Sequence, residues 1–161
     1  MEKLFIICVD DQQEVLNALE KDLIEFDASL NLEVCDTANE ALELMDEIDQ
    51  NGNFTALVIS DQVMPEMNGV EFLAQIEADD RFKFIRKVLL TGQATHQDTI
   101  EAINIGGIDK YVAKPWSKEE MVELVKTLVT GFIFDKGLNH ESYREILDQQ
   151  VVLEEMRKRT I

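Results

Sequence analysis

Cysteine and basic residues are scarce in this chain of 161 residues, and each shortage excludes certain classes of protein. The two cysteines, Cys8 and Cys35, lie inside apolar runs, so we interpret them as small buried hydrophobes and not as a disulfide framework or metal site. No run approaches the roughly 20 apolar residues of a membrane span. The start, Met1-Glu2-Lys3, has no signal-peptide pattern. We therefore expect a cytoplasmic protein without membrane contact.

The shortage of basic residues leaves a net charge of −18, which is unevenly distributed. Residues 1–130 carry 10 Lys/Arg against 27 Asp/Glu, whereas residues 131–161 carry 5 against 6. A strongly acidic domain repels phosphate backbones and anionic lipid, so direct nucleic-acid binding is not expected. The 45% hydrophobic content is enough for a folded core and argues against disorder.

Four short apolar runs each end in a polar residue that is suited to chemistry. These runs and the residues that follow them are Leu4–Val9 before Asp10 and Asp11, Ala56–Ser60 before Asp61, Val88–Leu90 before Thr91, and Tyr111–Ala113 before Lys114. Runs this short and this rich in Val, Ile and Leu are typical of buried strands in a parallel sheet. Ligands of open α/β sheets bind beyond the carboxyl ends of the strands. The pattern therefore predicts three carboxylates, a hydroxyl and an amine along one edge.

Helical patterns alternate with these strands and with a fifth strand over Leu32–Cys35. Sequences typical of helix N-termini begin at Thr37, Thr95 and Ser117, and Gly131 is expected to follow the last of these helices. Alternation of this kind predicts an α/β fold with a parallel sheet covered by helices on both faces. We expect the flavodoxin-like doubly wound arrangement with strand order 2-1-3-4-5.

The expected cluster of Asp10, Asp11 and Asp61 requires a counter-charge. Two like charges 4 Å apart repel by about 4 kcal/mol at an effective dielectric constant of 20. Carboxylate, carbonyl and water oxygens favour Mg²⁺, with Mn²⁺ possible. A carboxylate can also act as a nucleophile toward phosphorus, with Lys114 and Thr91 holding oxygens of the transferred group.

In this order and spacing the residues resemble the receiver domain of two-component response regulators. The residues that carry the resemblance are Asp10-Asp11, Asp61 within Asp-x-x-Met-Pro-x-Met-x-Gly, Thr91, and Lys114-Pro115. The resemblance covers about residues 3–130. We therefore predict a receiver domain over residues 1–130 and a C-terminal helical extension over 131–161.

The resemblance implies a role for each matching residue. Asp61 is the expected phosphoacceptor, charged by a phosphohistidine on a sensor histidine kinase or a histidine phosphotransfer protein. The expected metal ligands are Asp11, Asp61, the backbone carbonyl of Val63 and, through a water, Asp10. Thr91 and Tyr111 are the expected switch pair, which changes the face formed by the fourth helix, the fifth strand and the fifth helix. The resemblance also implies a cis peptide bond between Lys114 and Pro115.

The implied function is a phosphorylation-controlled switch and not an enzyme that acts on outside substrates. Its output would be contact with a downstream protein or a linked output domain. A phosphorylation-independent scaffold with the same fold is the alternative. A metal-dependent phosphatase is a third hypothesis, but it needs a general acid/base where Val63 stands.

The tail beyond Gly131 carries no catalytic motif. From His140 to Arg159 the sequence predicts one helix, with Tyr143, Ile146 and Leu153 among its regularly spaced apolar residues. Two interpretations stay open: a helix packed on its own receiver domain, and a helix that mediates dimerisation or docks a partner.

Overall fold

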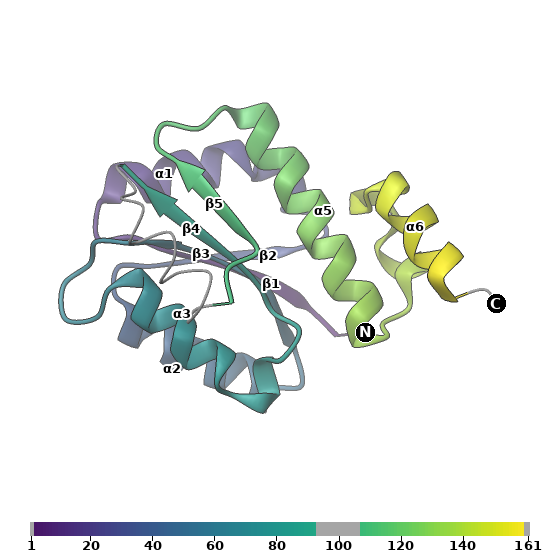
Figure 1. Cartoon of the computed structure of the whole chain (residues 1–161), viewed down its shortest axis with the longest axis horizontal. Coiled ribbons are helices and arrows are strands. Elements are labelled where there is room, and N and C mark those ends of the chain that lie inside the picture. Colours follow the sequence, from purple (N-terminus) through teal and green to yellow (C-terminus); the bar gives the residue numbers. More distant parts are fainter. Residues whose placement is uncertain (1, 93–106, 160–161) are drawn as a thin grey trace.

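The computed structural model describes residues 2–92 and 107–159, and Figure 1 shows a parallel sheet between two layers of helices. The strands are β1 (Leu4–Val9), β2 (Asn31–Cys35), β3 (Phe54–Asp61), β4 (Arg86–Thr91) and β5 (Lys110–Ala113). They lie in the order β2-β1-β3-β4-β5, and every neighbouring pair is parallel. The predicted fold class and strand order are therefore confirmed.

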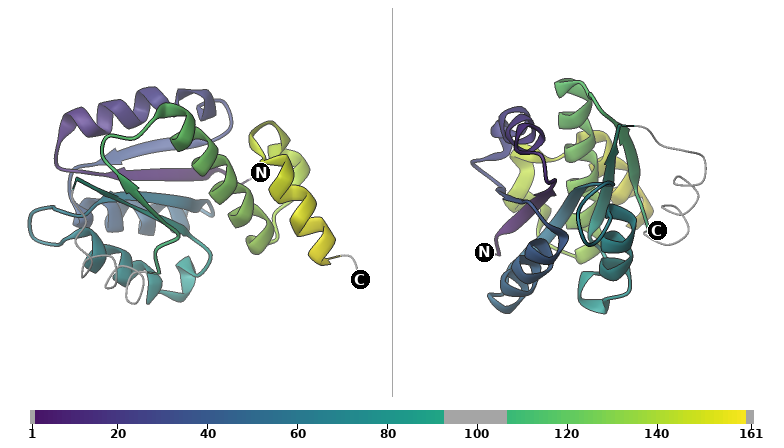
Figure 2. Two further views of the ribbon diagram at one scale, coloured as in Figure 1. Left: turned by 45° about the horizontal axis from the view of Figure 1, so that its top comes forward. Right: turned by 90° about the vertical axis from the view of Figure 1, so that its left-hand side faces the viewer.

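Helices cover both faces of the sheet, as the alternating pattern predicts. The α-helices are α1 (Gln13–Asp22), α2 (Ala38–Gln50), α3 (Gly69–Glu77), α5 (Lys118–Lys136) and α6 (Gln149–Arg159). Figures 1 and 2 show α1 and α5 on one face, with α2 and α3 on the other. Short 3-10 turns lie at Ile24–Phe26, Asp80–Phe82 and His140–Ile146. The helix expected after Thr95 lies outside the described residues.

Two of the predicted helix starts are confirmed. The side chains of Thr37 and Ser117 each accept a hydrogen bond from the backbone N–H three residues ahead, at 3.1 Å. These bonds satisfy N–H groups that a helix start leaves unpaired. The fullest cap lies at the start of α3, where Asn68 and Glu71 exchange side-chain and backbone hydrogen bonds.

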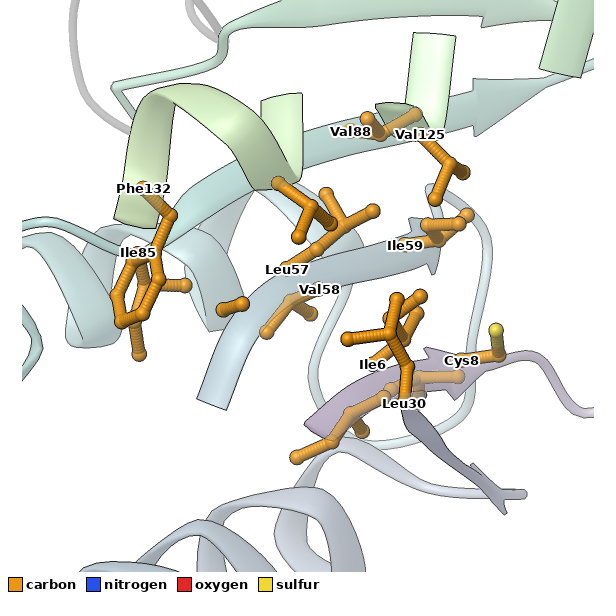
Figure 3. Close-up of a cluster of buried hydrophobic side chains, with 14 of the residues drawn as sticks. Ile6, Cys8, Leu30, Leu57, Val58, Ile59, Ile85, Val88, Val125 and Phe132 are labelled. Carbon is orange, nitrogen blue, oxygen red and sulfur yellow. The ribbon is translucent and has the colours of Figure 1, made fainter. Parts of the chain in front are cut away.

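The core lies between the central strands and the helices. Leu57 and Ile59 of β3 and Val88 of β4 are fully buried, and Figure 3 shows them on the side where Val125 and Phe132 of α5 pack. Full burial of one such aliphatic side chain contributes about 1.5–3 kcal/mol. Successive residues of β3 point to opposite faces of the sheet, and all of them from Thr55 to Asp61 are buried. The strand is therefore packed on both faces, which fixes the position of its carboxyl end.

The expected end of the fifth helix at Gly131 is wrong, because α5 continues to Lys136. A Cβ atom on Gly131 would lie 2.6 Å from the Arg86 guanidinium, which itself pairs with Asp135 at 2.7 Å. Gly131 therefore leaves room for the side chain of Arg86, which reaches α5 from β4. The helix instead ends at Gly137, whose φ of 76° is the left-handed conformation that favours glycine.

The continuous helix predicted over His140–Arg159 is also wrong. A 3-10 turn covers the first part, and Leu147, with φ −75° and ψ 143°, separates it from α6. Tyr143 and Ile146 in the turn are buried together with Leu147. Figure 2 shows α6 beside the C-terminal half of α5. The tail therefore packs on its own domain, and any additional linker, dimerisation or docking role stays a prediction.

Candidate phosphoryl-transfer site

Three carboxylates meet at the carboxyl ends of β1 and β3, where the sequence predicts them. One oxygen from each of Asp10, Asp11 and Asp61 lies within 4.8 Å of the others. Asp10 is fully buried and Asp61 is 6% exposed, whereas Asp11 faces solvent. Continuous apolar strands end at this point, so the polar residues that follow them are held at one edge of the sheet. The arrangement provides an acidic cluster with one side open to solvent.

Lys114 completes the cluster from the end of β5. Its ammonium nitrogen lies 2.8 Å from Oδ1 of Asp61 and 3.0 Å from Oδ2 of Asp10. Its backbone N–H donates to the carbonyl of Thr91 at 2.8 Å, which ties the start of the turn to β4. The peptide bond between Lys114 and Pro115 is cis, as the family resemblance implies.

Burial and pairing oppose each other in this cluster. Burial raises the pKa of Asp10 above its ordinary value, although hydrogen bonds from the Gln12 N–H and from Lys114 partly offset it, and the charge of Asp61 raises it further. Burial alone would lower the pKa of Lys114, but its hydrogen bonds to Asp61 and Asp10 outweigh burial and the net shift is upward. The ammonium therefore stays charged between the two carboxylates.

The loop after Asp61 is held by contacts that the sequence reveals only in part. A Cβ atom on Gly69 would collide with the backbone carbonyl of Asp61, so this position requires glycine. The Gly69 N–H donates to the Gln62 carbonyl at 2.9 Å, and the Val70 N–H donates to the Gln62 side chain at 3.0 Å. Gln62 therefore returns the chain toward α3 and fixes the backbone beside Asp61. The sequence marks Gly69 as part of a motif but gives no signal for the role of Gln62.

The predicted switch residues lie on adjacent strands. Thr91 ends β4 and is 5% exposed, and its partner in the β5 register is Ala113. Tyr111 lies two residues earlier on β5, opposite Leu89, and is half-buried. Among the residues that the structure describes, its hydroxyl has no hydrogen-bond partner. Burying a hydroxyl without a partner is unfavourable.

The donor set fits a hard divalent cation. Carboxylate oxygens are the ligands that Mg²⁺ and Mn²⁺ select. Within residues 2–92 and 107–159 this is the one group of three or more Asp, Glu, His or Cys residues whose ligand atoms are close enough to share an ion. Val63, whose carbonyl is an expected ligand, lies in the loop two residues after Asp61 with its side chain 77% exposed. Its role as a ligand stays a prediction.

Comparison with known proteins agrees with this fold. The model of the response regulator receiver domain family matches residues 6–126. The chain therefore belongs to the response regulator receiver domains of two-component systems. Proteins of this family act as phosphoacceptor switches.

Individual relatives differ in how much of them this chain covers. It is 27% identical to the chemotaxis protein CheY1 of Helicobacter pylori (strain J99) over 124 residues, which are 77% of this chain and 95% of that protein. It is also 27% identical to the hydrogenase transcriptional regulatory protein HoxA of Cupriavidus necator over 155 residues, but these are 96% of this chain and 29% of HoxA. The chain thus spans nearly all of one relative and less than a third of the other.

Solved structures support the same assignment. The signal receiver domain of an HD domain-containing protein from Pseudomonas fluorescens Pf-5 superimposes with a TM-score of 0.70 at 27% identity, covering 81% of this chain and 98% of that one. A CheY-like receiver domain from Methanospirillum hungatei gives a TM-score of 0.68 at 26% identity, covering 82% and 97%. Among the described residues, none of the helices is both long and apolar enough to cross a membrane.

Proposed function

We propose that this protein accepts a phosphoryl group on Asp61 from a partner phosphohistidine, with Mg²⁺ required and Mn²⁺ able to replace it. The observation that carries the proposal is the contact of Lys114 with both Asp61 and Asp10. The exposed carboxylate of Asp11 lies next to this pair, on the side of the cluster that is open to solvent. This geometry supplies a nucleophile, an ammonium and a hard-cation site within one cluster. Asp61 would form the acyl phosphate while the bond between phosphorus and the histidine nitrogen breaks.

Each neighbouring residue has a separate task in this proposal. Asp11 and Asp61, the Val63 carbonyl and, through water, Asp10 would hold the cation, which neutralises charge on the phosphoryl oxygens. The Lys114 ammonium would bind a second phosphoryl oxygen, and the Thr91 hydroxyl would donate to a third. The protein would promote its own phosphorylation and dephosphorylation and would not turn over outside substrates.

The proposed output is a change in protein contact. Movement of Thr91 toward the phosphoryl group would leave space into which the Tyr111 ring turns. This would shift the equilibrium between two conformations of the surface that includes β5 and α5. The chain is also 30% identical to histidine kinase P4 from Formosa agariphila over 128 residues, which make up 9% of that protein. We propose a sensor histidine kinase or a histidine phosphotransfer protein as the phosphodonor.

Downstream, we propose that the switch acts in the cytoplasm on a separate protein, on a linked output domain or on a second copy of the chain. The similarity to a chemotaxis protein that this chain covers almost completely supports the first of these, and the similarity to the much longer HoxA supports the second. The net charge of −18 argues against direct nucleic-acid contact. The scaffold alternative has no support, because Asp10, Asp11, Asp61 and Lys114, which phosphoryl transfer would need, are all present.

The decisive test compares wild type with Asp61→Asn. Incubation with acetyl phosphate and Mg²⁺, followed by intact-mass spectrometry, should show one added phosphoryl group on wild type and the donor-free background on Asp61→Asn. Asp27→Asn is the matched control because it removes an exposed carboxylate outside the cluster, and it should behave as wild type. Chelation of the metal should abolish the reaction. Undiminished labelling of Asp61→Asn would refute the assignment.

A further inference from the structure

Trp116, the one tryptophan of the chain, makes a hydrogen bond that the proposed chemistry does not use. Its indole N–H donates to Oδ2 of Asp22 at 2.9 Å. Asp22 is the last residue of α1, and Trp116 stands two residues after Lys114 in the turn between β5 and α5. The bond therefore joins the turn that follows Lys114 to a residue of α1 that lies 94 positions away in the sequence.

This turn is flanked by two surface hollows, and Trp116 is only partly buried where it packs against the core. Between it and α1 lies a groove of about 390 Å³, whose lining includes Val15, Ala18 and Pro115. On the other side a hollow of about 610 Å³ lies against β5 and α5, and Pro115 and Trp116 line that as well. Close packing around the turn is therefore incomplete, so directional bonds contribute to its position.

Directional bonds hold the turn at three points. The Lys114 N–H donates to the Thr91 carbonyl at 2.8 Å, and the Ser117 hydroxyl caps α5. Between them, the indole bond to Asp22 is the side-chain hydrogen bond that ties the turn to α1. Lysine has a flexible four-carbon stem that is not pre-organised by itself, so the position of its backbone limits where the ammonium can rest.

We propose that Trp116 is a positioning residue: its bond to Asp22 holds the turn so that the Lys114 ammonium lies between Asp61 and Asp10. Phenylalanine at this position would fill much of the same space but has no N–H to donate. The consequence for phosphorylation rests on the proposed function of Asp61. The consequence for the Lys114 ammonium does not, because the ion pairs are present before any phosphoryl group arrives.

The first experiment measures phosphorylation by acetyl phosphate in Trp116→Phe. We expect the rate constant at saturating donor to fall about three- to tenfold, the range that the loss of one hydrogen bond represents. The half-saturating Mg²⁺ concentration should stay within about twofold, because the carboxylates are untouched. Asp22→Ala should reproduce the loss, whereas Asp22→Asn keeps an acceptor oxygen and should restore the rate. Glu20→Ala, on an exposed position of the same helix, is the control.

A second comparison tests whether Trp116 acts through Lys114. In a Lys114→Ala background there is no ammonium to position, so adding Trp116→Phe should cause no further loss. A wild-type rate in Trp116→Phe would overturn the proposal. So would an equal additional loss in the Lys114→Ala background, because the tryptophan would then act by another route.

A third measurement does not depend on phosphorylation. In ¹H–¹⁵N spectra of the unphosphorylated protein, the ammonium of Lys114, assigned by its absence in Lys114→Ala, should give a signal protected by its carboxylate partners. Trp116→Phe and Asp22→Ala should broaden or remove that signal, and Asp22→Asn should keep it. An unchanged signal in Trp116→Phe would refute the positioning role. If wild type accepts no phosphoryl group, the proposed function fails, and this spectrum still decides the role of Trp116.

Discussion

The two ends of the sheet are built on opposite principles. At the carboxyl ends of the strands, Asp10, Asp61 and Lys114 are held close together, and both carboxylates are buried. At the amino ends, where Figure 1 shows the tail beside α5, apolar side chains pack together and polar groups of the tail are paired. We expect the first end, which carries the proposed chemistry, to cost stability and the second end to contribute it. Such a division is expected where a reactive site must stay poised.

The amino-end contacts show how the tail contributes. The Tyr143 hydroxyl donates to the Glu2 carbonyl at 2.9 Å, which joins the tail to the segment just before β1. The Asp148 N–H donates to the buried Thr130 hydroxyl of α5, also at 2.9 Å. Burial raises the pKa of Tyr143, so its neutral form is the one that suits the folded state. These polar groups of the tail have neutral partners, in contrast to the crowded carboxylates at the other end.

The largest effect on stability is expected from the tail core. Ile146→Ala should lower the free energy of unfolding by about 2–4 kcal/mol, because it removes a side chain that is 4% exposed and leaves a cavity. Urea unfolding followed by circular dichroism measures this. Leu153→Ala on α6 is the control: this side chain is 63% exposed, and the change should be within about 0.5 kcal/mol. Equal effects of the two variants would show that the turn does not pack as described.

A smaller loss is expected at the start of α6. Oδ1 of Asp148 accepts hydrogen bonds from the N–H groups of Gln150 and Val151, at 3.0 and 3.3 Å, and Oδ2 accepts one from the Thr127 hydroxyl at 2.9 Å. Asp148→Ala should therefore cost about 1–2 kcal/mol, the usual range for a lost N-cap. Asp148→Asn keeps a capping oxygen and should cost much less in the same urea titration. Phosphorylation should be unaffected by either variant, because both lie at the amino end.

The strands and their order follow from the sequence because local pattern and global packing agree. Continuous apolar runs fit only strands that are buried on both faces, and alternation with helices then fixes a parallel sheet. The same logic predicts that Asp10, Asp61 and Lys114 lie together, since residues that follow parallel strands must share an edge. The prediction of their proximity is confirmed, whereas their individual roles stay predictions.

The structure of the tail and the contacts that support the site could not be predicted from the sequence pattern, because they depend on residues that are distant in sequence. Gly131 suggests a helix end until the Arg86 side chain that crosses it is known. Leu147 has no local feature that marks a break, yet it separates two helical segments that pack beside α5. The bond between Trp116 and Asp22 spans 94 residues and leaves no periodic signal. Local sequence patterns do not predict long-range side-chain contacts of this kind.

At the carboxyl end of the sheet we expect a substitution to stabilise the protein, in contrast to the losses expected in the tail. With metal chelated, Asp10→Asn should raise the free energy of unfolding by about 1 kcal/mol, an ordinary size for one substitution. The amide oxygen of the new side chain would still accept from the Gln12 N–H, which lies 2.8 Å from Oδ1 of Asp10, while Lys114 keeps its 2.8 Å contact with Asp61. What is lost is a buried charge beside a second carboxylate. Asp27→Asn, an exposed change, should leave stability unaltered.

The pH dependence of this gain tests its cause. Because burial raises the pKa of Asp10 in the folded state, that state binds the proton more tightly than the unfolded chain does. Wild type therefore recovers stability as pH falls through the folded-state pKa, and the recovery is complete below the ordinary value of 3.8. The advantage of Asp10→Asn should be full at neutral pH and shrink as the solution is acidified, measured by urea titrations across that range. A constant advantage would assign it to packing, and a loss of stability at neutral pH would mean that the ion pair with Lys114 outweighs the burial of charge.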